Sequence, residues 1–196
     1  MRIIGGTHRG RKLVDWEEGA IRPMRDFVRS ALFNILVDMV PGARFLDLYA
    51  GTGSVGLEAL SRGARSCVFV DSSAEACAII RRNLDALDLL AVGEVFEGEV
   101  PRLIEELQRR GRRFDVVFVG PPYHRGLVPA TLELLGRGRL LSDDPVVIGE
   151  IHRSEAAEDA YGALRLVDER RYGDNRLMLY RTARGGRGGN EPWQSV

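Results

Sequence analysis

Closely spaced glycines follow an apolar run near the first quarter of the chain. Arg44–Tyr49 is a predicted strand, and Gly51-Thr52-Gly53-Ser54-Val55-Gly56 follows it and opens a predicted helix. Because they lack side chains, Gly51 and Gly53 let the backbone approach a ligand closely, and amides at the helix start can face a carboxylate or phosphate. The pattern indicates a ligand of the nucleotide type. A tight turn without a ligand is the alternative.

Asp71 adds a second group with a suitable position. It lies twenty residues after Gly51, at the end of the next predicted strand, Ser66–Val70, where a carboxylate can accept hydrogen bonds from both ribose hydroxyls. The sequence therefore predicts a nucleoside site. A dehydrogenase needs room for nicotinamide, whereas this sheet is expected to end in an antiparallel hairpin and its fourth strand runs into a Gly-Pro-Pro-Tyr loop. These features favour S-adenosylmethionine over NAD.

Two further carboxylates are candidates for the same site. Asp47, four residues before Gly51, either orders the glycine loop or lies near the ammonium group of the ligand. Glu99, just past the third predicted strand, either accepts from the adenine amino group or is an exposed loop glutamate. The cofactor-binding candidates are Asp47, Tyr49, Gly51, Thr52, Gly53, Asp71, Ser72 and Glu99.

The elements that must position these residues alternate along the chain. Predicted helices at Ala74–Ala86, Arg102–Arg110 and Leu127–Leu135 separate predicted strands at Val95-Phe96, Asp115–Val119 and Pro145–Ile151. Such alternation implies an α/β fold with a parallel sheet and helices on both faces. Leu164–Tyr172 and Arg176–Arg181 flank the turn Gly173-Asp174-Asn175 and must be antiparallel. We expect a mostly parallel, seven-stranded sheet that ends in an antiparallel hairpin.

A small basic extension precedes the predicted sheet. Arg2–Gly6 and Arg9–Val14 are expected to form a hairpin around a glycine-rich turn. Met24–Met39 has apolar residues at helical spacing, and Phe27, Leu32 and Ile35 are expected in the core. The chain is thus divided into the hairpin and helix (1–40), the sheet domain (41–182) and an arginine- and glycine-rich tail expected to be disordered (183–196).

Composition narrows the classes of function. The 28 basic and 28 acidic residues cancel, so overall charge gives no argument for steering toward nucleic acid, although both ends are basic. Apolar runs stay short of the roughly 18 residues that a membrane span needs, and residues 1–6 do not resemble a signal peptide, so a cytoplasmic protein is expected. Cys67 and Cys77 indicate neither a zinc site nor a disulfide framework.

Several segments, in their order along the chain, resemble the RsmD family of bacterial methyltransferases, which act on small-subunit (16S) ribosomal RNA. These segments are Arg2–Gly6, Arg9–Leu13, Arg22-Pro23, Val28-Arg29, Leu32-Phe33-Asn34, Asp47–Gly56, Leu57–Ala64 and Tyr172-Gly173-Asp174. The resemblance implies a Rossmann-like class I methyltransferase fold with S-adenosylmethionine as the donor. It further implies methylation of the exocyclic N2 of one guanine. We expect a monomer that acts on 16S RNA, either free or in an assembling small subunit.

The resemblance also identifies a catalytic loop. In the family, an Asp/Asn-Pro-Pro-Tyr/Phe sequence supplies a side-chain acceptor and a proline carbonyl to the amino group, and its aromatic ring stacks on the extruded base. The matching catalytic candidates are Gly120, Pro121, Pro122 and Tyr123, so the side-chain acceptor is missing. A hydrogen bond of this kind is worth roughly 1.5–3 kcal/mol, or about ten- to two-hundredfold in rate. A catalytically impaired RNA-binding relative is therefore one alternative, and an ordinary rigid turn is another.

Cations near the expected site are candidates for phosphate contacts, with a solvated surface as the alternative. The RNA-binding candidates are Arg9, Arg11, Lys12, Arg22, Arg25 and Arg125. His124 is not expected to act as a base, because the alkylated nitrogen can lose its proton to water. His8 and His152 are expected to be incidental. Tyr172 either packs beneath the site, which is preferred, or contacts RNA.

Two other enzyme classes remain as rivals. A proline-pair loop suits any planar amino group, so an amino methyltransferase for another substrate, DNA adenine or a protein glutamine, is an alternative that the N-terminal hairpin disfavours. An NAD-dependent dehydrogenase is a more distant one.

Overall fold

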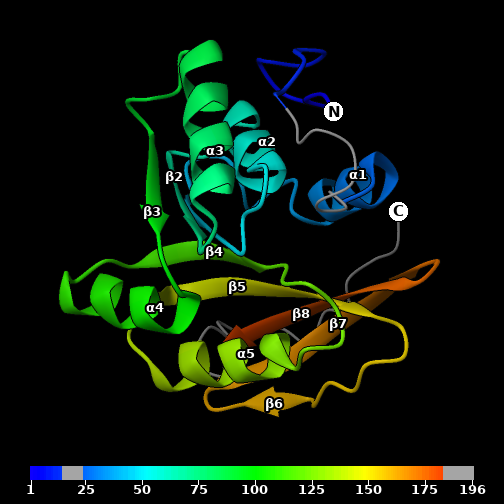
Figure 1. Cartoon of the computed structure of the whole chain (residues 1–196). Helices are drawn as coiled ribbons and strands as arrows, with labels where there is room; N and C mark the ends of the chain where they lie inside the picture. The colour runs from blue at the N-terminus through cyan, green and yellow to red at the C-terminus, as the bar shows by residue number, and fades with distance from the viewer. Residues whose placement is uncertain (15–23, 183–196) are drawn as a thin grey trace.

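The computed structural model describes residues 1–14 and 24–182, and within them eight strands form one sheet. The strands are β1 (Arg44–Leu48), β2 (Ser66–Asp71), β3 (Gly93–Glu97), β4 (Phe114–Val119), β5 (Leu141–His152), β6 (Ala160–Tyr161), β7 (Leu164–Tyr172) and β8 (Asn175–Thr182). The helices are α1 (Asp26–Ile35), α2 (Ser54–Ser61), α3 (Ala74–Ala86), α4 (Val100–Arg109) and α5 (Leu127–Arg137). Figure 1 shows helices on both sides of the sheet.

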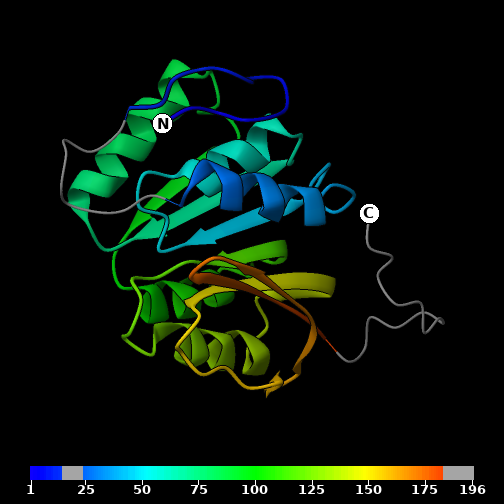
Figure 2. The ribbon, with the colours of Figure 1, turned by 90° about the vertical axis from the view of Figure 1, so that its right-hand side faces the viewer.

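The sheet has the strand order β3-β2-β1-β4-β5-β8-β7-β6. Its first five strands in this order are parallel, whereas β8, β7 and β6 pair in antiparallel fashion. Figure 2 shows α1, α2 and α3 over one face and α4 and α5 over the other. Because successive side chains of a strand point to opposite faces, Phe45 of β1 packs into the core under α1–α3 and Leu46 into the core over α4 and α5. Asp47 therefore points to the same side as Phe45.

The alternation of strands and helices confirms the expected α/β class, with one correction to the sheet. It has eight strands and not seven, because the two-residue strand β6 pairs with β7 at the sheet edge. A strand of this length carries no apolar alternation that a sequence pattern could show. The antiparallel pair formed by β7 and β8 is as expected.

The first helix differs from the expectation at both ends and on one face. α1 begins at Asp26 and ends at Ile35, and turns rather than helix follow it to Met39. Leu32 is fully buried, as expected, and Ile35 is partly buried. The expectation for Phe27 was wrong, since it is 70% exposed. Val28, the next residue, faces the core in its place, so the apolar stripe is one position out of phase with Phe27.

The N-terminal segment forms the expected hairpin, held by one bridge between Arg2 and Lys12 and not by two full strands. The Ile3 amide donates to the Arg11 carbonyl at 3.0 Å, and the Gly10 amide donates to the Ile3 carbonyl at 2.9 Å. Ile3 itself is 1% exposed and packs into the core under α1–α3. The hairpin is therefore seated on the sheet domain.

Glu58 of α2 anchors this hairpin. Its carboxylate accepts hydrogen bonds from the amides of Ile4 at 2.8 Å and Gly5 at 2.7 Å. It also pairs with Arg62 at 2.8 Å and lies 3.9 Å from Arg29, a fully buried residue of α1. One buried carboxylate thus joins the hairpin, α1 and the helix that follows the glycine loop.

Candidate cofactor and catalytic site

The loops that carry the candidate residues meet at the carboxyl edge of the parallel strands. β1 pairs with β2 on one side and with β4 on the other. The Ala50 amide donates to the Val70 carbonyl at 3.0 Å, and the Gly120 amide donates to the Leu48 carbonyl at 3.3 Å. The glycine loop, the loop after β2 and the Gly-Pro-Pro-Tyr loop therefore share one edge of the sheet.

The three glycines of the loop serve different steric purposes. A Cβ atom at Gly56 would lie 2.3 Å from the Phe69 ring, and one at Gly53 would lie 2.9 Å from Ile80. Both glycines thus let the loop and α2 pack closely on β2 and α3. Gly51 has a φ of +55°, and a Cβ atom there would meet no atom within 4 Å. Its open side is where a ligand has room to approach.

Asp71 uses both carboxylate oxygens to hold the edge together. One accepts from the Gly51 amide at 2.8 Å, and the other accepts from the Ser73 amide at 2.9 Å. Each oxygen keeps a second acceptor site. Ser72, between Asp71 and Ser73 in the chain, is exposed. The contact with Gly51 shows that the two residues, twenty positions apart in the sequence, meet at this edge of the sheet.

Asp47 is buried beneath the loop. Its side chain accepts a hydrogen bond from the Gly56 amide at 2.9 Å, inside the first turn of α2. Burial raises the pKa of Asp47 to about 8, the Gly56 bond opposes this shift, and the nearby Asp71 charge adds to it. The geometry assigns loop ordering to Asp47. A cation placed beside it would also favour its charged form.

Tyr49 and Thr52 complete the turn between β1 and α2. Tyr49 adopts a left-handed φ of 61°, an uncommon conformation for a non-glycine residue, and its hydroxyl lies 2.8 Å from that of Thr131 on α5. Thr52 is 3% exposed. Its carbonyl accepts from the side chain of Asn83 at 3.5 Å. Glu99 is exposed at the start of α4, and its charge contributes to the raised pKa of Tyr49 after burial, so it faces the same edge.

Gly120 begins the loop after β4, and the ring of Phe118 fills the space beside it. A Cβ atom at Gly120 would lie 2.5 Å from that ring. In the next two positions, Pro121 is buried and Pro122 is exposed. A larger residue at Gly120 therefore requires the Phe118 ring to move.

Tyr123 is held by a buried polar group. Its hydroxyl donates to Glu150 of β5 at 2.8 Å, and the side-chain amide of Asn175 donates to the same Glu150 oxygen at 2.6 Å. Glu150 is 6% exposed, and burial raises its pKa. Burial, followed by the Glu150 charge, raises the pKa of Tyr123, which keeps the phenol protonated. The ring is half-buried and fixed in orientation.

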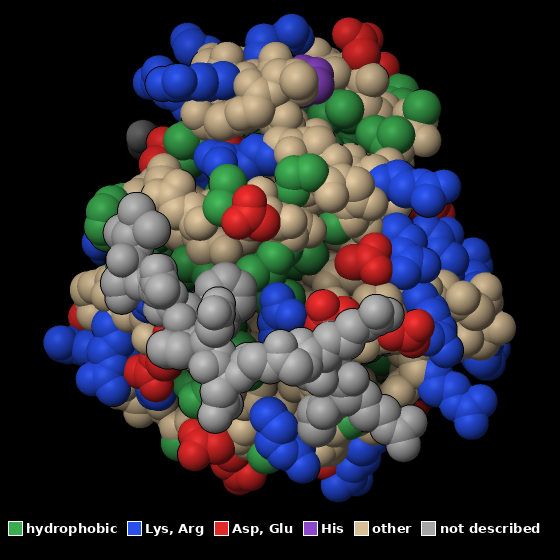
Figure 3. Space-filling model, turned by 180° about the vertical axis from the view of Figure 1, so that it is seen from behind, with side chains coloured by type: hydrophobic (Ala, Val, Ile, Leu, Met, Phe, Trp, Pro, Cys, Tyr) green, Lys and Arg blue, Asp and Glu red, His purple; other side chains and the backbone are tan. Residues whose placement is uncertain are grey.

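The cationic candidates fall into two groups. Arg9, Arg11 and Lys12 are exposed on the hairpin, and blue side chains gather there at the upper left of Figure 3. Arg11 also donates to the Ala86 carbonyl at the end of α3 at 2.6 Å. Arg25 and Arg125 are exposed, and the Arg25 charge acts on the pKa of Tyr123, which places it near that ring. Arg22 lies outside the described residues.

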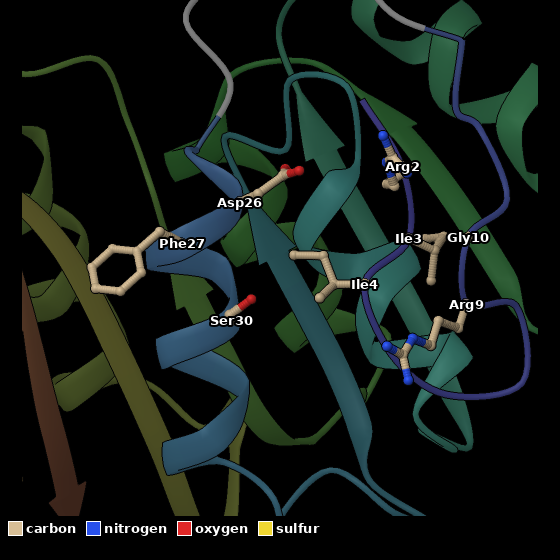
Figure 4. Close-up of a pocket in the computed structure, with 8 residues that line it drawn as sticks. All are labelled: Arg2, Ile3, Ile4, Arg9, Gly10, Asp26, Phe27 and Ser30. Carbon is tan, nitrogen blue, oxygen red and sulfur yellow. The ribbon is translucent and has the colours of Figure 1, made fainter.

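A hollow of about 360 Å³ lies between the hairpin and α1. Figure 4 shows its lining, which is Arg2, Ile3, Ile4, Arg9 and Gly10 from the hairpin and Asp26, Phe27 and Ser30 from α1. The Phe27 ring points away from the hairpin in this view and meets Tyr172 edge to face at 5.8 Å. This contact and partial burial agree with the packing expected for Tyr172. The hollow contains none of the cofactor-binding candidates.

Three residues that position the site were missed by the sequence analysis. Glu58 and Glu150 are described above, and Asn83 of α3 is the third. The Asn83 side chain exchanges hydrogen bonds with the backbone of Val14, at 2.7 and 3.0 Å, and also donates to Thr52. It thus links the segment after the hairpin to the glycine loop. Apart from Arg62, which lies one helical turn after Glu58, the partners named above lie 25 to 69 residues away in the chain, so no local pattern marks these contacts.

Comparison with known proteins places this geometry in a family. A family model described as "Conserved hypothetical protein 95" matches residues 1–181. "Ribosomal RNA small subunit methyltransferase D" of Escherichia coli (strain K12) is 35% identical over 150 residues, covering 76% of this chain and 74% of that protein. The chain belongs to the RsmD family. The resemblance seen in the sequence is thereby confirmed.

Further relatives cover nearly all of this RsmD-family chain. "Putative rRNA methyltransferase YlbH" of Bacillus subtilis (strain 168) is 32% identical over 181 residues, covering 92% of this chain and 98% of that one. The solved structure "Putative methyltransferase yhhF from Escherichia coli" has a TM-score of 0.83 at 32% identity, covering 94% of this chain and 98% of the other. The fold is therefore the Rossmann-like class I fold of S-adenosylmethionine-dependent methyltransferases.

In residues 1–14 and 24–182, no group of three or more histidine, cysteine, aspartate or glutamate side chains is arranged to hold a metal ion. Within the same ranges, no helix is both long enough and apolar enough to cross a lipid bilayer.

Proposed function

We propose that this protein uses S-adenosylmethionine to methylate the exocyclic N2 of one guanine in 16S ribosomal RNA. The observation that carries the proposal is the junction of two loops at one sheet edge. The glycine loop, tied to Asp71, lies beside the Gly-Pro-Pro-Tyr loop, whose first amide binds the end of β1. A donor on one side and an extruded base on the other can meet there.

The residues around the glycine loop fit the donor. The open side of Gly51 gives room for close approach, and Asp71 offers free acceptor sites to the ribose hydroxyls. Glu99 would accept from the adenine amino group. Asp47, Tyr49, Thr52, Gly53 and Ser72 would shape the loop around the rest of the ligand. The bound donor supplies an electrophilic sulfonium methyl group.

The second loop would orient the amino group. The lone pair of a guanine N2 is delocalised into the ring, so the enzyme must align this nitrogen and stabilise the positive charge that develops on it. The Pro121 carbonyl would accept from the N–H, and the Tyr123 ring, fixed through Glu150, would stack on the base. Pro122 makes the turn rigid. No side chain needs to act as a strong base, because the alkylated nitrogen is acidic.

Gly120 raises a second candidate function, an RNA-binding protein with little or no turnover. The family acceptor at this position is absent, and the Phe118 ring occupies its space. The substitution Gly120→Asp, which requires the Phe118 ring to move, distinguishes the methyltransferase from the RNA-binding protein with little turnover. A large gain in methylation supports an impaired site, whereas equal and robust activity in both chains shows that the Pro121 carbonyl suffices.

RNA would approach across the hairpin side of the molecule. Arg9, Arg11 and Lys12 would contact phosphates from the hairpin, and Arg25 and Arg125 would do so beside Tyr123. Arg22 belongs to the same proposal, although it lies outside the described residues. We propose that the protein is a monomer and acts in the cytoplasm. Its substrate would be 16S RNA, either alone or in an assembling small subunit.

A methylation assay tests the proposal. In vitro transcribed, unmodified 16S ribosomal RNA is incubated with the purified protein and methyl-labelled donor, then digested to nucleosides. The label should appear in N2-methylguanosine. Label in another nucleoside would overturn the proposed specificity, and donor binding without any transfer would favour the RNA-binding alternative. Transfer to DNA adenine or to a protein glutamine, with none to RNA, would favour the rival amino methyltransferases.

A further inference from the structure

Three aromatic rings cluster where the Gly-Pro-Pro-Tyr loop meets the end of β5. The His124 and His152 ring centroids are 4.8 Å apart, and those of Tyr123 and His152 are 5.8 Å apart. Tyr123 and His124 are 6.4 Å apart. His124 is exposed and His152 is partly buried. Neither histidine has a part in the chemistry proposed above.

One carboxylate fixes the backbone of both histidines. A Glu155 oxygen accepts from the His124 amide at 2.9 Å, and the other oxygen accepts from the His152 amide at 2.9 Å. His124 has a φ of 60°, in the left-handed region, which a non-glycine residue adopts only at some cost. The clamp from Glu155 holds the loop in this conformation, so the position of His124 is set by the fold.

Two of the rings are also fixed through their own polar atoms. Nδ1 of His152 accepts from the Ser154 amide at 3.3 Å and lies 2.7 Å from the Ser154 hydroxyl. Tyr123 is fixed by its bond to Glu150. Rings that are already oriented lose little conformational freedom when a planar ligand stacks on them. The cluster is therefore a preorganised aromatic surface.

Charged groups of both signs surround the cluster. The Glu150 and Glu155 carboxylates already accept hydrogen bonds within the fold, whereas the arginines nearby are exposed. Arg125 follows His124 directly and is exposed, and Arg25 acts electrostatically on Tyr123. Aromatic rings interleaved with arginines are the usual surface for unstacked nucleotides, whose bases stack while their phosphates pair with the cations. Extruding a base toward Tyr123 also leaves its neighbour in the RNA without its stacking partner.

We propose that His124 and His152 form a stacking platform for the RNA base adjacent to the guanine that is methylated. The inference rests on the proposed function, and it gives the protein a second base-binding position. Tyr123 takes the extruded base. The two imidazole planes are tilted by 59°, so the neighbouring base stacks on one imidazole and contacts the other along its edge. The platform thereby contributes affinity for single-stranded or opened RNA at the mouth of the site.

Substitutions that remove the imidazole rings but keep the local hydrogen bonds measure what the rings contribute to RNA binding. Asparagine tolerates the left-handed conformation of His124, and at position 152 its side-chain oxygen can replace Nδ1 as the acceptor for Ser154. The double variant His124→Asn/His152→Asn should bind in vitro transcribed 16S RNA about tenfold more weakly while it keeps its affinity for S-adenosylmethionine. His152→Phe retains a ring and should bind RNA more tightly than His152→Asn. Equal RNA binding by wild type and double variant would overturn the proposal, as would equal losses in the phenylalanine and asparagine variants.

An experiment on the wild-type protein tests the same proposal without depending on whether the variants fold. The chain has three histidines, so their ring proton resonances can be followed by NMR during titration with a single-stranded adenosine hexanucleotide. Stacking should shift the resonances of His124 and His152 upfield, and by more than that of His8, which lies in the hairpin beside the proposed phosphate contacts and not beside a base. Shifts absent from both platform histidines would overturn the inference. Failure of wild-type methylation with these shifts present would instead defeat the proposed function alone.

Discussion

The substitution Asp47→Asn tests how the buried carboxyl group holds the glycine loop. Asp47 is 1% exposed and accepts a hydrogen bond from the Gly56 amide. Burial raises its pKa from 3.8 to about 8. Asparagine keeps an oxygen in the same place for the Gly56 amide and carries no ionisable proton. The variant therefore removes the titration and keeps the contact.

The sign and the size of the effect follow from this shift. Because the pKa in the folded chain lies above that in the unfolded chain, the contribution of Asp47 to stability is fully present at low pH and is lost as the pH rises. The loss runs between pH 3.8 and about 8, at about 1.4 kcal/mol per pH unit. Between pH 5 and pH 7 it amounts to roughly 3 kcal/mol.

Urea unfolding of both proteins at pH 5, 6 and 7 measures this quantity. All other ionisable groups are shared, so they cancel in the difference between the variant and the wild type. The free energy of unfolding of Asp47→Asn, relative to wild type, should increase by roughly 3 kcal/mol from pH 5 to pH 7. A difference that stays constant over this range would refute the assignment of a buried, poorly solvated carboxyl group at Asp47.

Three further substitutions test separate parts of the site. Gly51→Ala and its control Gly111→Ala both place a methyl group on a left-handed residue with open space around it, so each variant should lose about 1 kcal/mol of stability. Only Gly51→Ala should weaken S-adenosylmethionine binding, measured by calorimetry. Equal affinities of the two variants would contradict the donor site. Glu58→Gln leaves the buried Arg29 without its carboxylate neighbour, so it should lower the free energy of unfolding by about 3 kcal/mol. It should also weaken RNA binding in a filter assay more than donor binding. Unchanged stability would show that Glu58 does not anchor the hairpin. Glu150→Leu should slow methylation about tenfold in single-turnover assays, whereas Glu150→Gln, which keeps an acceptor for Tyr123, should stay near wild type; parallel losses would exclude a positioning role for the Glu150 oxygen.

The placement of the glycine loop beside Asp71 was predictable because its signals are local. A strand, a glycine turn and a helix follow one another without a break from Arg44 to Ser61, and the next strand ends at Asp71. Chain connectivity forces these parts together once the strands are parallel. The hydrogen bond between Gly51 and Asp71 is the structural counterpart of that spacing.

The features that escaped prediction depend on contacts between distant segments. Glu58 occupies an ordinary helical position, and only the folded chain brings the Ile4 and Gly5 amides to its carboxylate. Glu150 lies near the end of the buried strand β5, where the pattern shows burial but not the partner Tyr123. Phe27 was misplaced because helical periodicity gives the spacing of an apolar face and leaves its phase open by one residue.

A crystal structure of the protein with S-adenosylhomocysteine tests the central claim most directly, since that claim concerns where the donor and the acceptor base meet. The ribose should lie on Asp71, the ligand should pass the open side of Gly51, and its sulfur should face the Pro121–Tyr123 segment. A ligand seated elsewhere, for example in the hollow between the hairpin and α1, would contradict the account. So would a sulfur atom that points away from Tyr123.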